Sequence, residues 1–353
     1  MTPLYRDILS QPATLEHVAD HQFGPGRSEL IEASGWLRRA QDIVFSGMGS
    51  SLFACIPLRC YLSSHGIAAT AIETSELLHF HRKILKPDSV LVLVSRSGET
   101  VEATRLLDLA RDGHVPVIGV TNEGDSTLAR NATRTLLVNS ARDQLVAVQT
   151  YTATLATLLC LGAAVCGEFD GQLRDTFAHV PAALANCLDA CAAASRNWRE
   201  LLETPSPVYL LGRGASLASI FEGALLFHEV AKTPAVAMDA GNFRHGPCEA
   251  VSAAFRSVIF GSQVATFDLD AGLARDILHL GGQAAWIGLP AAGLHSAALC
   301  GWPADIPEVF APLVEIAPIQ IATYRLAEWR GITPGDFYIT GQVTLSETGF
   351  ERR

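Results

Sequence analysis

The sequence contains Phe45-Ser-Gly-Met-Gly-Ser-Ser-Leu52 and, in its second half, Leu210-Leu-Gly-Arg-Gly-Ala-Ser-Leu217. Four residues coincide at one constant offset, namely Gly47 with Gly212, Gly49 with Gly214, Ser51 with Ser216 and Leu52 with Leu217. The same offset takes Ser97 to Ser262, which lies just after the apolar run 257–260. A self-similarity of this length predicts two homologous domains in tandem.

Each half of the chain alternates strand-like apolar runs with helical stretches. The strands predicted in the first half are Ile43–Ser46, Ala68–Ile72, Ser89–Val94, Val115–Val120 and Thr135–Val138. A long helix from about Leu145 to Cys166 and a helical linker over 173–202 are expected to follow. This alternation is typical of an α/β fold, with one doubly wound parallel sheet per domain between two layers of helices.

The composition excludes several classes of partner. The formal net charge is −10 and the pI is near 5.5, whereas a nucleic-acid or anionic-membrane surface needs a cationic patch. The most apolar stretch, 151–166, contains three threonines and is shorter than the roughly 20 residues of a bilayer span, so we expect a buried helix. No secretory signal is visible at the first residues, which makes the cytoplasm the expected location.

The segment from Gly47 to Leu52 follows a predicted strand and opens a helix. Backbone N–H groups and the helix dipole favour an anion at such a place. The segment also imitates a dinucleotide-binding fingerprint, with Glu73 near the end of the second strand, but Leu52 replaces the third glycine which that fingerprint needs. A structural turn without a ligand is the other alternative.

A second polar segment, Ser95-Arg-Ser-Gly-Glu-Thr100, follows the strand 89–94. Short hydroxyl donors and free backbone N–H groups can converge on a tetrahedral anion without a lysine, which is typical of a phosphate site. An ordinary helix N-cap explains the same residues equally well, because serine and threonine are favoured there. Spacing alone leaves both interpretations open.

Several motifs together resemble the sugar isomerase (SIS) family, and most closely the isomerase half of glucosamine-6-phosphate synthase. They are Leu4-Tyr-Arg-Asp-Ile-Leu-Ser-Gln-Pro12, Gly49-Ser-Ser51, Ser95-Arg-Ser-Gly-Glu-Thr100, Arg244-His-Gly-Pro247 and Pro318-Ile-Gln-Ile321. The resemblance implies two tandem SIS domains, at 1–170 with a lead-in helix and at 205–330. It also implies a helical linker at 171–204 and a tail at 331–353 that closes the active site.

The resemblance further implies which residues bind the substrate. They are Ser50, Ser51, Ser95, Arg96, Ser97 and Thr100 around the phosphate, together with Val148 and Thr150 in a further lining segment. Arg96 stands where the synthase has a glutamine, so its contact with the substrate is expected to differ.

Two residues of the second half are candidates for catalysis. Glu229 ends the apolar stretch 222–229, and a carboxylate there must face water, a partner or a substrate because its desolvation is costly. His245 precedes a Gly-Pro turn, where a loop residue can project into a cleft. Taken alone, the first is more often a surface residue and the second more often structural. The resemblance implies that Glu229 carries a proton between C1 and C2, that His245 opens the sugar ring, and that His245 reaches the neighbouring subunit's site in a homodimer.

No cofactor or metal is expected. His79 and His81 alternate after a strand end without a companion carboxylate or cysteine at ligand spacing, so we interpret them as structural or pocket-rim residues. The eight cysteines form no Cys-x-x-Cys motif and are expected to be reduced. Cys187 and Cys191 lie one helical turn apart, which favours packing.

Three departures from the synthase limit the chemistry. No glutaminase domain is expected, because only about 42 residues precede the first predicted strand. Leu226 matches the lysine one turn before the base, and Gly341 or Gln342 matches the lysine near the C-terminus, so activation through a Schiff base is not expected.

A base, a ring-opening acid and a phosphate site remain. The sequence thus predicts an isomerase or deaminase acting on an amino-hexose 6-phosphate through an enediol or enolamine. The alternatives are a fructosamine-6-phosphate deglycase and a non-catalytic regulator that senses sugar phosphates.

Overall fold

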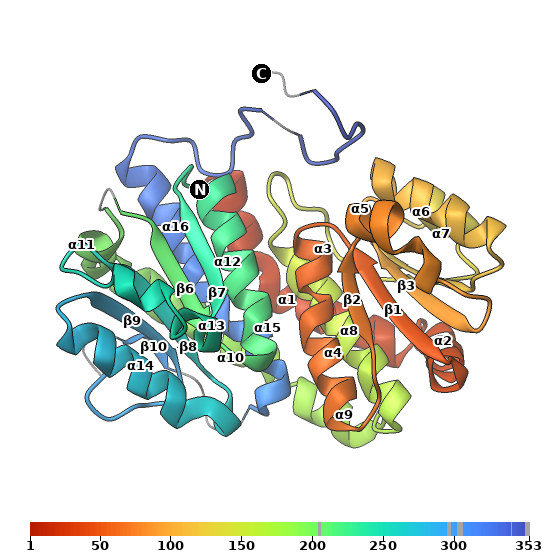
Figure 1. Cartoon of the computed structure of the whole chain (residues 1–353), viewed down its shortest axis with the longest axis horizontal. Helices are drawn as coiled ribbons and strands as arrows, with labels where there is room; N and C mark the ends of the chain where they lie inside the picture. The colour runs from red at the N-terminus through yellow and green to blue at the C-terminus, as the bar shows by residue number, and fades with distance from the viewer. Residues whose placement is uncertain (204–205, 295–297, 302–305, 340, 350–353) are drawn as a thin grey trace. The chain divides into compact units, whose positions relative to one another are not determined.

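A computed structural model describes residues 1–203, 206–294, 298–301, 306–339 and 341–349. The chain divides into two compact units (Figure 1). Unit 1 consists of Met1–Pro12 and His179–Asp336, and unit 2 of Ala13–Ala178 and Phe337–Arg353. The expected linker end at Thr204 lies outside the described residues, as do Thr340 and residues 350–353 of the expected tail.

Unit 2 contains a parallel five-stranded sheet in the order β2-β1-β3-β4-β5. Its strands are β1 (Asp42–Gly47), β2 (Thr70–Glu73), β3 (Ser89–Val94), β4 (Val117–Thr121) and β5 (Arg134–Leu137). Every residue of β3 is buried, because helices cover both faces of the central strand. The predicted strand 89–94 is therefore confirmed. The other four observed strands differ from the predicted ones only at their ends.

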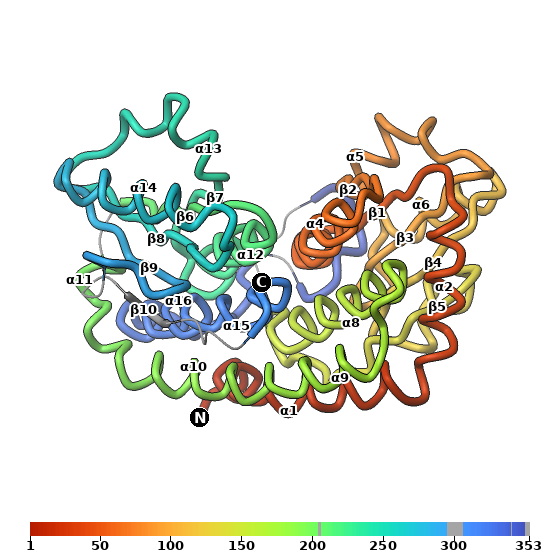
Figure 2. The backbone as a smooth tube through the Cα atoms, turned by 90° about the horizontal axis from the view of Figure 1, so that it is seen from below, coloured from red at the N-terminus to blue at the C-terminus, as the bar shows by residue number. Residues whose placement is uncertain are grey.

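The helices of unit 2 connect these strands. They are α2 (Arg27–Arg39), α3 (Ser50–Phe53), α4 (Cys55–Ser64), α5 (Thr74–Glu76), α6 (Val101–Asp112), α7 (Thr127–Asn131), α8 (Gln149–Cys166) and α9 (Gly171–Phe177). The helices α2 and α4 pack against α8, and α6 packs against β3 and β4 (Figure 2). Apolar residues of α6, such as Leu106 and Leu107, share a core with Leu91 and Leu93 of β3.

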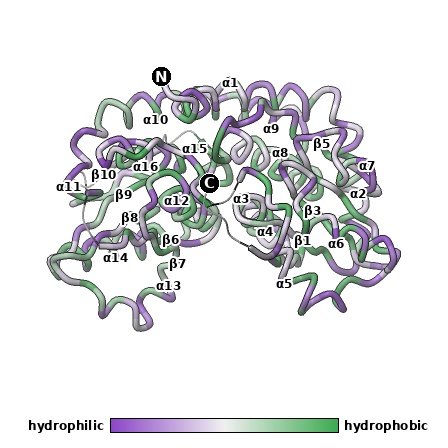
Figure 3. Tube along the Cα trace, turned by 90° about the horizontal axis from the view of Figure 1, so that it is seen from above, coloured by the Kyte–Doolittle hydropathy of each residue, from purple (hydrophilic) through white to green (hydrophobic). Residues whose placement is uncertain are grey.

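Unit 1 repeats this topology with the order β10-β9-β8-β6-β7. Its strands are β6 (Val208–Gly212), β7 (Ala235–Asp239), β8 (Arg256–Gly261), β9 (Gln283–Gly288) and β10 (Ala298–Gly301). Its helices are α10 (Val180–Ala194), α11 (Arg199–Leu202), α12 (Leu217–Glu229), α13 (Ala240–Phe243), α14 (Phe267–His279), α15 (Ala311–Glu315) and α16 (Ala317–Trp329). In Figure 3 the strands β3 and β8 are largely hydrophobic, as expected of buried parallel strands. The predicted pair of α/β sheets is confirmed.

The lead-in helix α1 (Pro3–Phe23) contributes its first residues to unit 1 and the remainder to unit 2. Within unit 1, Gln11 Nε2 donates to Gln320 Oε1 on α16 over 2.7 Å. Within unit 2, Thr14 Oγ1 donates to Gln149 Oε1 at the start of α8 over 2.9 Å.

Two helical regions are long and apolar enough to be tested as membrane spans, 149–166 and 171–202. The first is α8, which is 94% buried inside the protein, so the predicted buried helix is confirmed. The second covers the expected helical linker and consists of several helices. It breaks at Ala178 and His179, and Pro181, which has no N–H to donate, lies in the first turn of α10.

Candidate active site

The two polar motifs of unit 2 follow neighbouring strands. Strands β1 and β3 pair directly, with Ser46 beside Leu93, and the strand order reverses between them. In open parallel sheets, ligands bind outside the carboxyl ends of the strands at this reversal. The segments that begin at Gly47 and at Ser95 both leave the sheet there, so the fold places the predicted serines at one edge.

The loop after β3 is held by its own hydroxyl groups. Ser95 Oγ lies 3.2 Å from Thr100 Oγ1 and accepts from the Gly98 backbone N–H over 3.2 Å. Ser97 Oγ accepts from the Glu99 N–H over 3.2 Å. Three hydroxyls are thereby gathered within six residues at the entrance to α6, which is a geometry suited to a phosphate group.

Gly98 is required by this loop. Its φ is +64°, and a Cβ atom there would lie 2.1 Å from Ser126 Oγ. Its carbonyl accepts from the Leu128 N–H over 3.1 Å, which joins the loop to α7. Only glycine combines the left-handed backbone with so close an approach.

Glu99 fastens the same loop to the next one. Its carboxylate accepts from the Thr127 backbone N–H over 2.6 Å and from Thr127 Oγ1 over 2.8 Å. The backbone hydrogen bond from Thr127, followed by the one from its side chain, lowers the pKa of Glu99. The carboxylate is therefore ionised at neutral pH and positions α7 beside the loop.

The loop after β1 is compact as well. Gly49 has φ +51°, and a Cβ atom on Gly47 would lie 2.9 Å from the Leu52 nitrogen. The short helix α3 begins at Ser50, and both Ser50 and Ser51 are partly exposed. The loop thus presents these two serines at the same sheet edge as the hydroxyls of the loop after β3.

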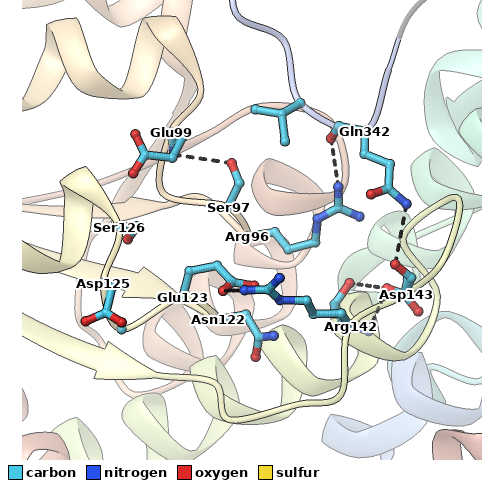
Figure 4. Close-up of a pocket in the computed structure, with 13 residues that line it drawn as sticks. Arg96, Ser97, Glu99, Asn122, Glu123, Asp125, Ser126, Arg142, Asp143 and Gln342 are labelled. Carbon is cyan, nitrogen blue, oxygen red and sulfur yellow. Dashed lines mark hydrogen bonds and ion pairs between the residues drawn. The ribbon is translucent and has the colours of Figure 1, made fainter.

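A cavity of about 460 Å³ lies beside the loop after β3 (Figure 4). The residues that line it are Arg96, Ser97, Glu99, Asn122, Glu123, Gly124, Asp125, Ser126, Arg142, Asp143, Thr150, Gln342 and Val343. Three of the predicted binding residues are among them, namely Arg96, Ser97 and Thr150. Ser50, Ser51, Ser95, Thr100 and Val148 are not.

The lining of this cavity combines both signs of charge. Arg142 forms an ion pair with Glu123, and Arg96 Nη2 donates to the Gln342 main-chain oxygen over 2.7 Å. Figure 4 shows both guanidinium groups between the loops that follow β3 and β4. Anionic and polar ligand groups can both find partners in such a cavity.

Asp143 organises the start of α8, although the sequence did not identify it as a site residue. Its carboxylate accepts from the backbone N–H groups of Val148 over 3.1 Å, Gln149 over 3.0 Å and Thr150 over 3.1 Å, and from Thr150 Oγ1. The helix begins only at Gln149 because these N–H groups are capped by Asp143. A lone Asp ahead of a long apolar helix was the available signal.

The two predicted residues of the lining segment differ in their surroundings. The Val148 side chain is 0% exposed and belongs to the core. Thr150 lines the cavity, and its hydroxyl donates to the Asp143 carboxylate.

The described part of the C-terminal segment, 341–349, packs on unit 2. Gln342 Nε2 donates to the Leu145 oxygen over 2.8 Å, and the Thr344 oxygen accepts from the Val101 N–H at the start of α6 over 3.2 Å. Glu347 lies 3.0 Å from Arg105 Nη1 and 3.6 Å from His79 Nε2. Gln342, one of the two positions expected to match a family lysine, thus lines the cavity.

The two candidate catalytic residues belong to unit 1. Glu229 is the last residue of α12 and is half-buried. His245 is exposed in the loop after α13, and its N–H donates to the Asn242 oxygen over 2.9 Å. They therefore come from α12 and from the loop that follows β7 and α13.

Lys232 brings an ammonium group to the end of α12. Its Nζ donates to the main-chain oxygens of Glu229 and Asp336. Burial lowers the pKa of Lys232, and the charges of Glu229 and Asp336 oppose this effect. Lys232 does not correspond to the synthase lysine one turn before the base, which Leu226 matches, because Lys232 follows Glu229 in the sequence.

The histidine and cysteine pairs show no ligand geometry. Cys187 and Cys191 lie with their sulfur atoms 3.9 Å apart and buried. Across the described residues, no group of three or more His, Cys, Asp or Glu could hold a metal ion. The cysteines at 55, 60, 160, 166, 187, 191 and 248 are free thiols.

Comparison with known proteins connects this site to a family. Residues 36–165, which include both loops, match the SIS domain family. The chain carries a SIS domain. The resemblance found in the sequence is thereby confirmed, and the chain is homologous to the isomerase part of glutamine–fructose-6-phosphate aminotransferases.

The relatives with curated descriptions are longer proteins. Glutamine–fructose-6-phosphate aminotransferase (isomerizing) of Pyrobaculum aerophilum is 26% identical over 338 residues, which cover 94% of this chain and 55% of the relative. The enzyme of that name from Pyrococcus horikoshii is 26% identical over 342 residues, with the same coverage of 94% and 55%. The chain spans about half the length of these relatives.

Solved structures share the fold of this chain. The C-terminal domain of glucosamine-fructose-6-phosphate aminotransferase from Francisella tularensis has a TM-score of 0.84 at 17% identity and covers 95% of this chain and 98% of its own. Glucosamine-6-phosphate deaminase from Thermotoga maritima has a TM-score of 0.78 at 21% identity, with 97% and 99% covered. Tagatose-6-phosphate ketose/aldose isomerase from Escherichia coli has a TM-score of 0.77 at 21% identity, with 95% of each chain covered.

Proposed function

We propose that this SIS protein is an enzyme that isomerises or deaminates an amino-hexose 6-phosphate. The observation that carries the proposal is the cluster of hydroxyls at Ser95, Ser97 and Thr100, held by Gly98 at the edge where β1 and β3 diverge. Ser50, Ser51 and Arg96 complete the phosphate site. Homology to the isomerase part of the aminotransferases supports the same substrate class.

The chemistry in this proposal is proton transfer between adjacent carbons. His245 donates a proton to the ring oxygen, which opens the sugar. The carboxylate of Glu229 then removes the proton from C2 of the open-chain amino sugar, which gives an enolamine, and returns it to C1. Water adds to the resulting imine, so ammonia leaves and a ketose 6-phosphate is formed.

Lys232 fits this scheme as a positioning residue. Its ammonium holds the last turn of α12 through the main-chain oxygen of Glu229. A base at the end of a helix needs such support, because the last carbonyls of a helix have no intrahelical partner.

The assembly and location follow the same family reasoning. We propose a homodimer with shared active sites, in which His245 serves the neighbouring subunit, and a cytoplasmic location. The expected partner is the sugar phosphate alone, without nucleic acid, membrane, cofactor or metal.

A fructosamine-6-phosphate deglycase is the second candidate function. The cavity beside the phosphate site favours it, because about 460 Å³ lies within the usual volume range of pockets for drug-sized ligands. Glu123 and Asp125 line that cavity and would suit a cationic aglycone.

A thermal-shift screen tests the proposal. Hexose, aminohexose and fructosamine 6-phosphates are compared with the unphosphorylated sugars, because a ligand that binds only the folded state raises its unfolding temperature. Ser97→Ala should reduce the shift for every phosphate ester, whereas the exposed control Ser63→Ala should leave it unchanged. Equal shifts for phosphorylated and unphosphorylated sugars would contradict the proposed phosphate site. Otherwise, the ester with the largest shift is the substrate to use for product analysis.

A further inference from the structure

In the internal repeat, a glutamate of unit 1 corresponds in sequence to a threonine of unit 2. At the offset that relates Gly47 to Gly212, Thr150 corresponds to Glu315. Thr150 lies in the first turn of α8 and lines the cavity beside the proposed phosphate site. Glu315 is the last residue of α15 and lies two residues before the start of α16.

Glu315 is buried among serine hydroxyls. It is 2% exposed, its Oε2 accepts from Ser216 Oγ over 3.1 Å, and its Oε1 accepts from Ser219 Oγ over 2.9 Å. Burial raises the pKa of Glu315 to about 7, while the hydroxyls of Ser262, Ser219 and Ser216 act to lower it. The side chain thus has a low-dielectric surrounding that contains several donors aimed at one group.

Two of these serines are themselves repeat positions. Ser216 corresponds to Ser51 and precedes α12, while Ser262 corresponds to Ser97 and follows β8. Strands β6 and β8 are neighbours, and the strand order of unit 1 reverses between them. The carboxyl group of Glu315 therefore lies at the counterpart of the edge that carries the proposed phosphate site in unit 2.

A filler without oxygen atoms would leave the hydroxyls of Ser216 and Ser219 without their acceptor, while the Ser262 hydroxyl is buried without a hydrogen-bond partner. Burying a hydroxyl without a hydrogen bond is unfavourable, and so is burying a carboxyl group in apolar surroundings. The two requirements are met together here, because the carboxyl oxygens accept from the serines just as phosphate oxygens accept from hydroxyl donors.

We propose that unit 1 retains the anion site of the repeat and that the carboxyl group of Glu315 fills it. The ligand class of this site is inorganic phosphate or a phosphate monoester, for which the carboxyl group is a built-in substitute. The inference rests on the proposed phosphate site of unit 2 for the identity of the ligand. Because the carboxyl group of Glu315 occupies the site of unit 1, the native chain has one sugar-phosphate site. Removal of this carboxyl group should allow the site of unit 1 to bind phosphate.

The experiment removes Glu315 and supplies inorganic phosphate to the full-length chain. Glu315→Thr introduces the residue that unit 2 has at Thr150, and Ser97→Ala is added to weaken the proposed site of unit 2. At phosphate about a hundredfold above its Kd, we expect the unfolding temperature of the double variant to rise by roughly 5–10 °C. Ser97→Ala alone should respond far less.

Two control variants distinguish binding of phosphate at an anion site from the mere opening of a cavity. Leu313→Ala opens a cavity from the same helix at a fully buried position without removing an acidic group, and phosphate should not stabilise it. Glu315→Gln fills the site with an amide of the same shape, so it should also show no gain. ³¹P NMR should report a bound-phosphate resonance in Glu315→Thr that both controls lack.

The outcomes for the two sites are distinguishable. An undiminished phosphate response in Ser97→Ala counts against the proposed site of unit 2, whereas the site of unit 1 is judged by the gain that Glu315→Thr adds to either background. No gain in Glu315→Thr overturns the inference. If that variant folds poorly, phosphate should restore its folding yield, and failure to do so also overturns it.

Discussion

The guanidinium group of Arg96 donates to the main-chain oxygen of Gln342 over 2.7 Å, so a residue of the proposed phosphate site holds the C-terminal segment. Arg96→Gln should release this contact while it keeps a polar side chain. We expect the segment 341–349 and the Val101 amide, which donates to Thr344, to exchange their hydrogens faster. Hydrogen-exchange mass spectrometry measures this, with Arg82→Gln as the exposed control. Unchanged exchange would mean that the remaining contacts of Gln342 and Glu347 suffice.

Gly98→Ala should destabilise unit 2 and weaken phosphate binding. The substitution combines an unfavourable positive φ with a Cβ atom 2.1 Å from Ser126 Oγ, so a loss of about 2–4 kcal/mol is expected. Gly66→Ala is the matched control, because Gly66 has φ +74° with no atom near its Cβ position. Urea unfolding should show a clearly larger loss for Gly98→Ala, and equal losses would argue against the packed loop.

The pH dependence of stability should report Glu315. Burial raises its pKa from 4.5 to about 7, so the folded state binds the proton more tightly than the unfolded state does. The resulting stabilisation is complete below pH 4.5 and is lost as the pH rises through 7, by about 3 kcal/mol. Urea unfolding between pH 5 and pH 8 should show this fall in the wild type and a flatter profile in Glu315→Gln. Parallel profiles would contradict the prediction.

Glu229→Gln should abolish turnover while binding is retained. An amide keeps the shape but cannot accept a proton, so kcat should fall by about 10²–10⁴. The assay uses the phosphate ester that the thermal screen selects, with the surface variant Glu200→Gln as the control. Near-normal turnover in Glu229→Gln would rule out this carboxylate as the base.

Mixing two inactive variants tests the shared site. If His245 serves the neighbouring subunit, heterodimers of Glu229→Gln and His245→Ala contain one complete site and should recover part of the activity. Subunit exchange is verified independently by mass spectrometry of labelled chains. Full inactivity after verified exchange would assign both residues to one chain's site.

The sequence was informative wherever local pattern determines structure. The buried apolar run 89–94 could be assigned to a strand from its composition, and the repeated glycine segment predicted the second sheet. Both signals arise from short-range requirements, since a fully buried parallel strand excludes polar residues and a tight strand-to-helix turn requires glycine.

Long-range contacts were out of reach. Nothing local indicates that Gln342 reaches the loop after β3 or that Glu315 meets Ser216. The two residues of each pair lie 99 or more positions apart in the chain, and a lone polar residue does not show which partner satisfies it. Arg96 and Ser97, the two candidate residues that line the cavity directly after a strand, could be located from the local pattern.

The division of the chain between its two units has a consequence for protein synthesis. The chain changes units after Pro12, after Ala178 and after Asp336. The sheet of unit 2 leaves the ribosome long before the Thr344 oxygen can accept its hydrogen bond from the Val101 N–H. Gln11 likewise cannot form its hydrogen bond with Gln320 until α16 has been synthesised. Neither unit can acquire its full set of hydrogen bonds until nearly the whole polypeptide has emerged. A nascent chain stalled midway should therefore present an incomplete first unit to chaperones, and a gene cut between the repeats would encode two fragments that each lack part of their own fold.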